Sequence, residues 1–404
     1  MKKKRRIEDH PDVARLFEAA RRNVDSAPRK HHLVPRMHLD NWAVDDKLRV
    51  VDLDAGSSWL SNPAKAARRT DYYRLEHDDL PPEDVPPLLF ETILGKVEAD
   101  AVPGLARLRE DAPTGDLVQT KYHPDLIMPV VDFLAFQAVR GERHRTTVYK
   151  IYAQSYQTLY ADLVDRDKLA AELARRFGRA PTEAELEENH TFMQDLADGT
   201  VTIGPAEAAA TVEVGKMAEA IRDLILERNW RVYRCSRPLV CPDEPVVPVG
   251  GPGTRRTEVP GFLNAGVVLF PLDPMTLLAM FRMDIEVLET AVMQTLDPSE
   301  VREVNRELSA NTQHYVFERP GDHIAETFTL PRWPSVMDFE GGYRTVDDPE
   351  PNVTRQFKRT RWANSATQPP WPIERWWTAA PIAPGAEFPR KDNWSLSNLE
   401  PRRR

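Results

Sequence analysis

Two adjacent histidines near the start of the chain are the first residues that could carry chemistry. His31 and His32 lie in the segment KHHLVP, residues 30–35, which has the texture of a strand. Neighbouring strand residues point to opposite faces, so one imidazole can face a site while the other packs. A neutral imidazole can bind a metal or act as a general base near pH 7. A purely structural role for both rings is the alternative.

Two glutamates, Glu91 and Glu98, are expected on one face of a helix. They are seven residues apart, which leaves them about 20° from alignment on a helix. Carboxylates that share a face can hold a divalent metal through their oxygens. The alternative is a solvated helix face, on which both carboxylates contact only water.

Polar residues interrupt a strongly apolar helical segment further along the chain. Gln137, Arg140 and His144 are spaced i, i+3, i+7 and would share one stripe of a helix. Polar groups buried in such surroundings need partners. Arg140 could pair with Glu91 or Glu98, or could bind a substrate phosphate or carboxylate through two parallel hydrogen bonds.

An acid is held between prolines in the segment PDEP, residues 242–245. Asp243 could bind a metal or orient a histidine there, or it could be a turn acid that accepts hydrogen bonds from backbone amides. A divalent metal, Mn²⁺, Mg²⁺ or Zn²⁺, is the cofactor that these residues would bind. The predicted catalytic residues are His31, His32, Gln137 and Arg140, and the predicted metal ligands are Glu91, Glu98 and Asp243.

Hydrophobic periodicity predicts an α+β fold. Apolar residues recur at helical spacing in five segments: 11–23, from 86, 124–160, from Thr182, and 206–228. Thr182 and Glu185 have the spacing of a capping box. Later segments predict strands, one further helix and an extended piece: strands near 48–53, over 230–249, at 266–270 and at 276–281, a helix over 298–313, and an extended segment at 314–317.

The helical middle, residues 85–228, should pack on a mixed or antiparallel sheet. That sheet would combine the strand near 48–53 with the strands of 230–282. Such an arrangement would also bring His31 and His32 toward Asp243.

Composition divides the chain into three parts. Residues 1–28 form a basic head and a short helix, residues 29–330 a single α+β core with the helical insertion, and residues 331–404 an extended tail rich in proline and tryptophan. Six of the nine tryptophans lie in this tail, so it is too apolar for a free linker. It either wraps its own domain or holds a partner subunit, since tryptophan is a favoured interface anchor.

Net charge and cysteine content indicate which classes of protein this chain can belong to. A net charge of -9 over 404 residues argues against a protein coated in nucleic acid, although a local basic patch could bind a polyanion. The two cysteines form no disulfide framework, which favours a reducing compartment and a cytoplasmic location. No apolar run approaches the ~20 residues of a membrane span, and none follows the basic residues 1–6, so we expect neither a span nor a secretory signal.

The order of these motifs resembles one family, the bacterial domain of unknown function numbered 4238. Its pattern looks like HHxVPxxxLxxW or F, then D-x-Y, a helix with glutamates, Q-x-x-R, S-D-x-P, P-L and a late helical Asn. The resemblance covers roughly residues 30–320, and it implies no established activity. Pro242 departs from the pattern, which prefers serine there. The matching residues are His31, His32, Pro35, Leu39, Trp42, Asp71, Tyr73, Glu91, Glu98, Gln137, Arg140, Asp243, Pro245, Pro271, Leu272 and Asn305.

Two function hypotheses follow from the residues. The first is a metal-assisted hydrolase that acts on a phosphodiester or nucleic acid, in which Arg140 neutralises developing charge and Gln137 orients water or substrate. The alternative is a non-enzymatic anion-binding or protein-interaction module, in a bacterial conflict or defence setting; the polar cluster could also serve stability alone. The expected partners are nucleic acid or a phosphorylated small molecule, no membrane, and a homo-oligomer formed through the tail.

Overall fold

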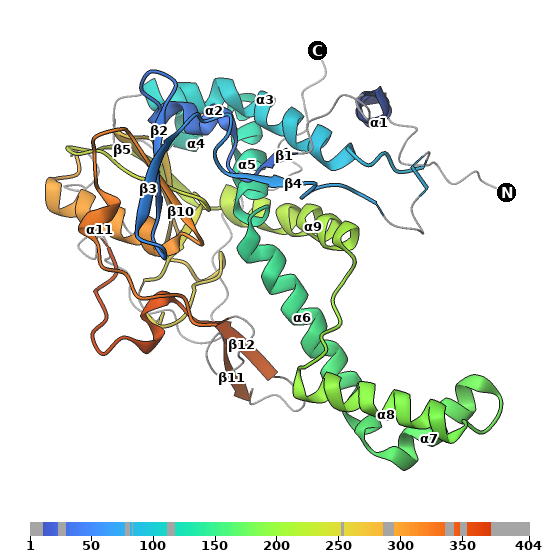
Figure 1. Cartoon of the computed structure of the whole chain (residues 1–404). Helices are drawn as coiled ribbons and strands as arrows, with labels where there is room; N and C mark the ends of the chain where they lie inside the picture. Colours follow the sequence, from blue (N-terminus) through green and yellow to red (C-terminus); the bar gives the residue numbers. More distant parts are fainter. Residues whose placement is uncertain are drawn as a thin grey trace.

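The fold is α+β, with antiparallel sheets packed among helices (Figure 1). This computed structural model describes residues 11–22, 30–76, 81–82, 84–110, 118–251, 254–285, 295–335, 343–347 and 354–372. The basic head at residues 1–10 and the tryptophans at 376, 377 and 394 lie outside these ranges. In the described part, no helix combines the length and the apolar character that crossing a membrane requires.

The described helices lie near the start of the chain, through its middle and, as α11, after the main sheet. Their bounds are α1 (Pro11–Arg22), α2 (Arg36–Leu39), α3 (Leu89–Glu110), α4 (Val118–Lys121), α5 (Pro124–Val139), α6 (Glu142–Tyr160), α7 (Arg166–Phe177), α8 (Glu183–Asp198), α9 (Glu207–Leu226) and α11 (Pro298–Asn311). Short 3-10 turns are η2 (Asp40–Trp42), η3 (Ala161–Val164), η4 (Ala325–Thr327) and η5 (Arg361–Asn364). The expected capping box at Thr182 and Glu185 starts α8.

The described strands form two four-stranded sheets and two small ladders. Their bounds are β1 (Lys30–His32), β2 (Leu48–Asp52), β3 (Ser57–Ser61), β4 (Arg68–Thr70), β5 (Asn229–Arg234), β6 (Cys241–Pro242), β7 (Val247–Val249), β8 (Val267–Asp273), β9 (Thr276–Phe281), β10 (Tyr315–Glu318), β11 (Tyr343–Asp347) and β12 (Thr354–Lys358). The strand orders are β5-β9-β8-β7 and β3-β2-β10-β6, with the pairs β1-β4 and β11-β12.

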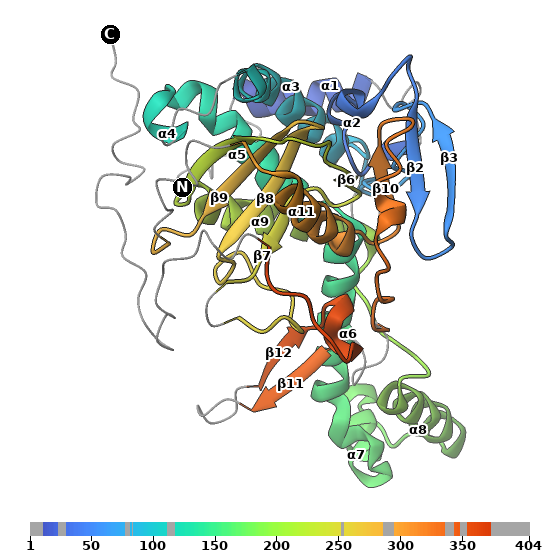
Figure 2. The same ribbon diagram turned by 90° about the vertical axis from the view of Figure 1, so that its left-hand side faces the viewer.

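The sheet β5-β9-β8-β7 is covered on both faces, which explains why its central strands are continuously apolar. On one face Val268 and Phe270 belong to the core shared with α3, α5 and α9. On the other face Val267 and Leu269 belong to the core shared with α11 (Figure 2). This sheet, with helices packed on both faces, is the core against which the surrounding loops are held.

The prediction of a single sheet is wrong. The strand near 48–53 is β2, and it pairs with β3 and β10 rather than with the main strands of 230–282. The stretch 230–249 contains Pro238, Pro242 and Pro245, which lack the amide donors of a continuous ladder. It therefore splits into β5, β6 and β7, and only the two residues of β6 join the sheet of β2, through β10.

The prediction of one helix over 124–160 is also wrong. Helix α5 ends at Val139 and α6 begins at Glu142. Between them Gly141 has extended backbone angles. A Cβ at this position would lie 2.6 Å from Oε1 of Glu244, so the break lets the Glu244 carboxylate approach the backbone.

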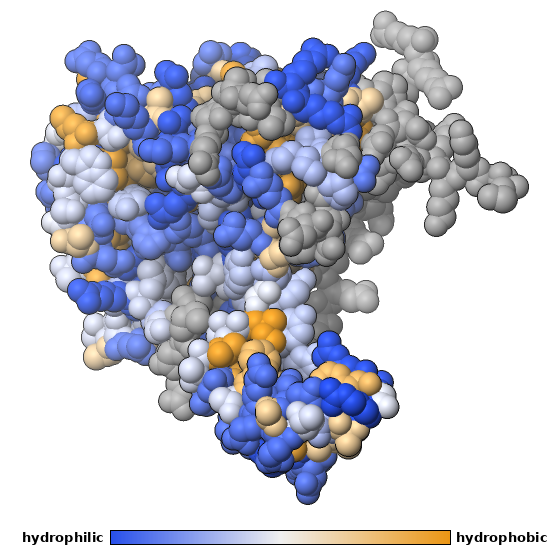
Figure 3. All heavy atoms as spheres, turned by 45° about the vertical axis from the view of Figure 1, so that its right-hand side comes forward, coloured by the Kyte–Doolittle hydropathy of each residue, from blue (hydrophilic) through white to orange (hydrophobic). Residues whose placement is uncertain are grey.

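A helical arm projects from the body (Figures 1 and 3). We use this name for the C-terminal half of α6 together with η3, α7 and α8. None of the three hydrophobic core clusters of the described residues draws a member from 140–207. The arm has a small interior of its own, which includes Leu169, Leu173 and Leu196.

Candidate functional site

The histidine strand is fixed by pairing with a short strand of arginines. β1 and β4 run antiparallel, with His31 opposite Arg69 and His32 opposite Arg68. Nε of Arg68 donates to Nε2 of His32 at 3.0 Å. Directly opposed residues on a ladder share a face, so the two arginines point to opposite faces of this ribbon.

Neither imidazole of the pair is placed as an open base. The backbone amide of Tyr73 donates to Nδ1 of His31 at 2.9 Å, and the His31 ring stacks on the Tyr73 ring at 5.6 Å. Burial lowers the pKa of His31. Burial, and then the charges of Arg68 and Arg140, lower the pKa of His32 to about 4. Both rings are therefore neutral near pH 7, and the catalytic roles predicted for His31 and His32 stay predictions.

Arg140 ties this strand to the helices. Its Nη1 pairs with Oε1 of Glu98 at 2.6 Å, and its Nε donates to the carbonyl of Leu33 at 2.9 Å. Nε2 of Gln137 donates to the same carbonyl at 3.0 Å. The structure thus brings Arg140, Gln137 and Glu98 together, and the predicted pairing of Arg140 with one of the two glutamates is confirmed for Glu98. His144, expected on the same stripe, lies beyond the break at Gly141.

Glu91 lies near the same guanidinium without pairing like Glu98. Burial raises the pKa of Glu91 to about 7, while the charge of Arg140 opposes this shift. Among the described residues, no group of three or more His, Cys, Asp or Glu side chains could hold a metal ion. The metal roles of Glu91 and Glu98 therefore stay predictions, and the adjacent positive charge of Arg140 disfavours a cation there.

Asp243 lies apart from the Arg140 cluster and binds backbone amides. Oδ1 accepts from the amide of Gln313 at 2.8 Å, and Oδ2 accepts from His314 and Tyr315 at 2.7 and 2.9 Å. Burial raises the pKa of Asp243, and these three amides oppose the shift. Asp243 therefore acts as the turn acid that orders residues 313–315, the alternative already set out for it.

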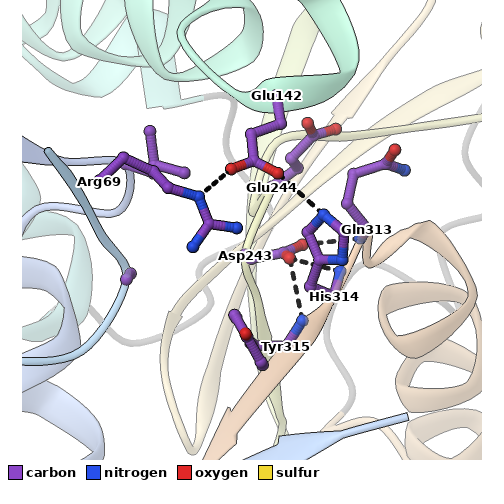
Figure 4. Close-up of a pocket in the computed structure, with 9 residues that line it drawn as sticks. Arg69, Glu142, Asp243, Glu244, Gln313, His314 and Tyr315 are labelled. Atoms are coloured by element: carbon purple, nitrogen blue, oxygen red, sulfur yellow. Dashed lines mark hydrogen bonds and ion pairs between the residues drawn. The ribbon is translucent and has the colours of Figure 1, made fainter. Parts of the chain in front are cut away.

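Residues 313–315 line an open pocket (Figure 4). Leu33 and Ala67 also line it, so the strand end held by Arg140 forms part of its wall. Glu142, the first residue of α6, lies at the centre of the polar wall. Its Oε1 pairs with Nε of Arg69, and its Oε2 pairs with Nε2 of His314 at 2.8 Å.

Electrostatics fix the charge states of these side chains. Burial opposes ionisation of Glu142, but hydrogen bonds from His314 and Arg69 outweigh it and lower the pKa of Glu142 to about 2. The same hydrogen bond raises the pKa of His314, against the effect of burial. The His314 side chain is 48% exposed, so an imidazole ring held by the Glu142 carboxylate faces the opening.

A second arginine braces the far side of the pocket. Nε of Arg143 pairs with Oε2 of Glu244 at 2.9 Å, and the Arg143 amide donates to Oε1 at 2.8 Å. The side-chain amide of Gln313 can form hydrogen bonds with Arg143 in one of its two orientations. In that orientation the oxygen accepts from Nη2 and Nε of Arg143, at 3.0 and 3.1 Å. The NH₂ group of Gln313 is then the part of the amide that does not contact Arg143.

Sequence reasoning missed most of the pocket. Arg69, Glu142 and the adjacent residues Gln313 and His314 come from three separate segments, and no spacing relates these segments. The available signals were weak: Glu142 follows the Q-x-x-R motif by two residues, and His314 begins a segment already expected to be extended. Of the seven predicted site residues, Asp243 alone lines the pocket.

A family model described as a protein of unknown function (DUF4238) matches residues 30–322. The chain belongs to this family. The DUF4238 match contains both the Arg140 cluster and every residue that lines the pocket, and it ends before β11, β12 and η5. No curated protein and no solved structure matches the chain.

Proposed function

We propose that this DUF4238 protein is a hydrolase that acts on phosphodiesters at the pocket of Arg69, Glu142 and His314. The observation that carries the proposal is the double pairing of Glu142, with Arg69 on one oxygen and with His314 on the other. This pairing orients the imidazole and favours its protonated form. It engages Nε2, so Nδ1 is the nitrogen left for a substrate.

The chemistry that fits this arrangement is general acid catalysis on a bound anion. Arg69, the Gln313 amide and the imidazolium would bind the phosphate oxygens and offset charge that develops on them. As water adds to phosphorus and the ester bond breaks, His314 would protonate the leaving oxygen, and the proton of the water would restore the imidazolium. The products are an alcohol and a phosphomonoester.

A non-enzymatic anion-binding module is the second candidate. The observation that favours it is the engagement of both Asp243 oxygens by amides and of Glu244 by Arg143, which leaves no carboxylate of the pocket placed to activate water. In that case the pocket binds a phosphate group without turnover.

The test is hydrolysis by the full chain of a phosphodiester whose leaving group is an alkoxide, the dinucleotide TpT, together with calorimetric binding of inorganic phosphate. We expect His314→Gln to lower turnover by about 100-fold or more. The matched control is His123→Gln, because His123 is 76% exposed. It lies at the other end of α5, whose 16 residues span about 24 Å.

The outcomes separate the two candidates. Equal turnover in His314→Gln and wild type would overturn the catalytic role of His314. Phosphate binding that depends on His314 without any turnover would establish the binding module instead. The same assay with EDTA, and with added Mn²⁺, Mg²⁺ or Zn²⁺, tests the metal that the sequence predicts.

A cytoplasmic setting belongs to this proposal. Cys235 and Cys241 are both buried free thiols, which suits a reducing compartment.

A further inference from the structure

The segment that carries Gln313 and His314 into the pocket leaves the C-terminal end of α11. The last carbonyl groups of a helix have no partner within the helix and need donors from elsewhere. Here the carbonyl of Asn311 accepts from Arg143 of α6, and the carbonyl of Thr312 accepts two donors from the tail. Side chains that are distant in the sequence therefore hold the backbone where it enters the pocket.

Trp333 and Arg361 are the two tail residues that bind Thr312. Nε1 of Trp333 donates to the Thr312 carbonyl at 2.7 Å, and Nη2 of Arg361 donates to the same oxygen at 2.9 Å. Both residues lie beyond the DUF4238 match, which ends at residue 322. In its described part the tail therefore packs on its own domain, and it contacts the residue that precedes Gln313.

The guanidinium of Arg361 is itself held by further partners. The Arg361 side chain is 1% exposed, and its Nη1 pairs with Oδ1 of Asp54 at 3.3 Å and donates to the carbonyl of Pro331 at 3.1 Å. A buried cation is costly unless it is paired and hydrogen-bonded, and these contacts offset that cost. A cation beside the end of α11 also matches the partial negative charge of a helix C-terminus. Arg361 thus joins the loop after β2, the start of the tail and the end of α11.

Trp333 links the same carbonyl to the arginine that braces the pocket. The Arg143 guanidinium lies 4.9 Å from the centre of the Trp333 ring, and the Arg361 guanidinium lies 5.1 Å from it. Arg143 in turn pairs with Glu244 on the pocket wall. The indole ring therefore contacts one guanidinium from the family core and one from the tail.

Asp243 holds the residues that follow Thr312. The backbone amides of residues 313–315 donate to its two carboxylate oxygens. The core thus fixes the amides of this segment, while the tail fixes the carbonyl of the residue before it. The backbone position of His314 decides whether its Nε2 can lie 2.8 Å from Oε2 of Glu142, because hydrogen bonds weaken steeply outside a narrow range of distance and angle.

We propose that Arg361 and Trp333 are positioning residues for the pocket, and that the tail completes a site otherwise built by the DUF4238 core. Their hydrogen bonds to Thr312 set the backbone position from which His314 reaches Glu142. Neither residue lines the pocket, so both act through the segment of Gln313 and His314. The inference rests on the proposed function for the anion that the pocket binds.

The test is NMR titration of the His314 imidazole in the full chain labelled with ¹⁵N-histidine, with His314→Gln to assign its signal. The charged groups near His314 are Glu142 and Asp243, which raise its pKa, and Arg69, which lowers it. We expect Arg361→Ala to move the pKa of His314 down toward about 6.5, because the pair with Glu142 loosens. A lost hydrogen bond to a charged group should also weaken sulfate binding about tenfold.

Three further variants separate positioning from general stability. Arg361→Lys keeps a cation and a donor near Thr312, so it should restore part of both effects. Trp333→Phe keeps a ring beside Arg143 but loses the indole N–H, so it should move the pKa of His314 in the same direction as Arg361→Ala. Arg359→Ala is the matched control, since Arg359 lies in the same part of the tail and binds Asn364 at 2.9 Å. It should leave the pKa and the affinity unchanged.

An unchanged pKa of His314 and an unchanged affinity for sulfate in a folded Arg361→Ala would overturn the proposal. Equal effects of Arg359→Ala and Arg361→Ala would overturn it as well, because they would trace the change to the tail as a whole. If Arg361→Ala does not fold by circular dichroism, Trp333→Phe decides in the same way. A wild type that neither binds sulfate nor hydrolyses TpT would count against the proposed function, while the titration of His314 still decides the positioning.

Discussion

At the residue scale, Arg140 shows how a motif of the sequence can be structural and still shape a site. Its guanidinium is buried and binds Glu98 and the carbonyl oxygens of His32 and Leu33. Leu33 in turn lines the pocket of Glu142 and His314. The Q-x-x-R motif therefore positions one wall of the pocket, rather than contacting a ligand there.

Replacing Arg140 should lower the stability of the fold. We expect Arg140→Ala to lower the free energy of unfolding by about 3–5 kcal/mol, because it leaves Glu98 and the His32 carbonyl without their partner and removes one of the two donors to the Leu33 carbonyl. Arg107→Ala is the control, since Arg107 is 53% exposed and lies 4.0 Å from Glu110; it should change stability by about 0.5 kcal/mol or less. Urea denaturation measures both, and equal effects would contradict the structural role of Arg140.

The charge state of His314 predicts how anion binding depends on pH. Glu142 raises the pKa of His314 above the usual histidine value of about 6.5, so the imidazolium persists to a higher pH than in an unfolded chain. Its contribution to binding is fully present below pH 6.5 and is lost as the pH rises through the raised pKa. We expect the affinity for sulfate, whose charge is constant over this range, to fall accordingly. His314→Gln should show a flat profile, and a parallel decline in that variant would refute the assignment.

At the element scale, the break between α5 and α6 decides where the pocket forms. A continuous helix would give Gly141 helical backbone angles and so change the direction in which the chain enters Glu142. Instead Gly141 starts a new helix, and Glu142 meets Arg69 from β4 and His314 from the segment after α11. The same break lets Glu244 reach the amide of Arg143.

A methyl group at this break should damage both stability and binding. The Cβ of Gly141→Ala would lie 2.6 Å from Oε1 of Glu244, so Glu244 or α6 must shift. We expect a loss of about 1–3 kcal/mol in unfolding free energy and weaker phosphate binding. Gly95→Ala is the matched control, because nothing lies within 4 Å of its added Cβ and alanine favours a helix. If Gly141→Ala and Gly95→Ala change the free energy of unfolding equally, the close approach of Glu244 to Gly141 does not contribute to stability.

At the scale of the whole molecule, the arm is separable from the body. The arm contributes no residue to the core clusters of the described residues. The chain enters and leaves the arm where Gly204 packs against the ring of Tyr149, and a Cβ added to Gly204 would lie 2.5 Å from that ring. It exposes Ile151, Leu159, Phe177 and Phe192, as Figure 3 shows by the apolar side chains on its surface.

Removal of the arm should therefore leave the pocket intact. We expect a chain in which residues 153–202 are replaced by a flexible linker of about four glycine and serine residues to fold and to bind phosphate within about twofold of wild type. Circular dichroism and calorimetry check this. A chain that no longer folds would show that the body depends on the arm.

The homo-oligomer expected through the tail stays a prediction, and light scattering on the full chain measures it.

Sequence patterns determined the features that depend on near neighbours. Periodicity places β9 over residues 276–281, and the capping box at Thr182 starts α8 as expected. The motif order also identified the family, and the chemistry of Arg140 predicted a carboxylate partner in α3. Each of these depends on residues a few positions apart, or on opposite charges that must pair once buried.

Only the tertiary structure decided which residues share a pocket. Arg69, Glu142 and His314 are brought together by the β1–β4 register, the break at Gly141 and the three amides that Asp243 binds. The division into two sheets likewise depended on β10 pairing between β2 and β6. These outcomes are non-local: they follow from the competition among distant segments for the same core and the same backbone partners, which no local pattern of residues records.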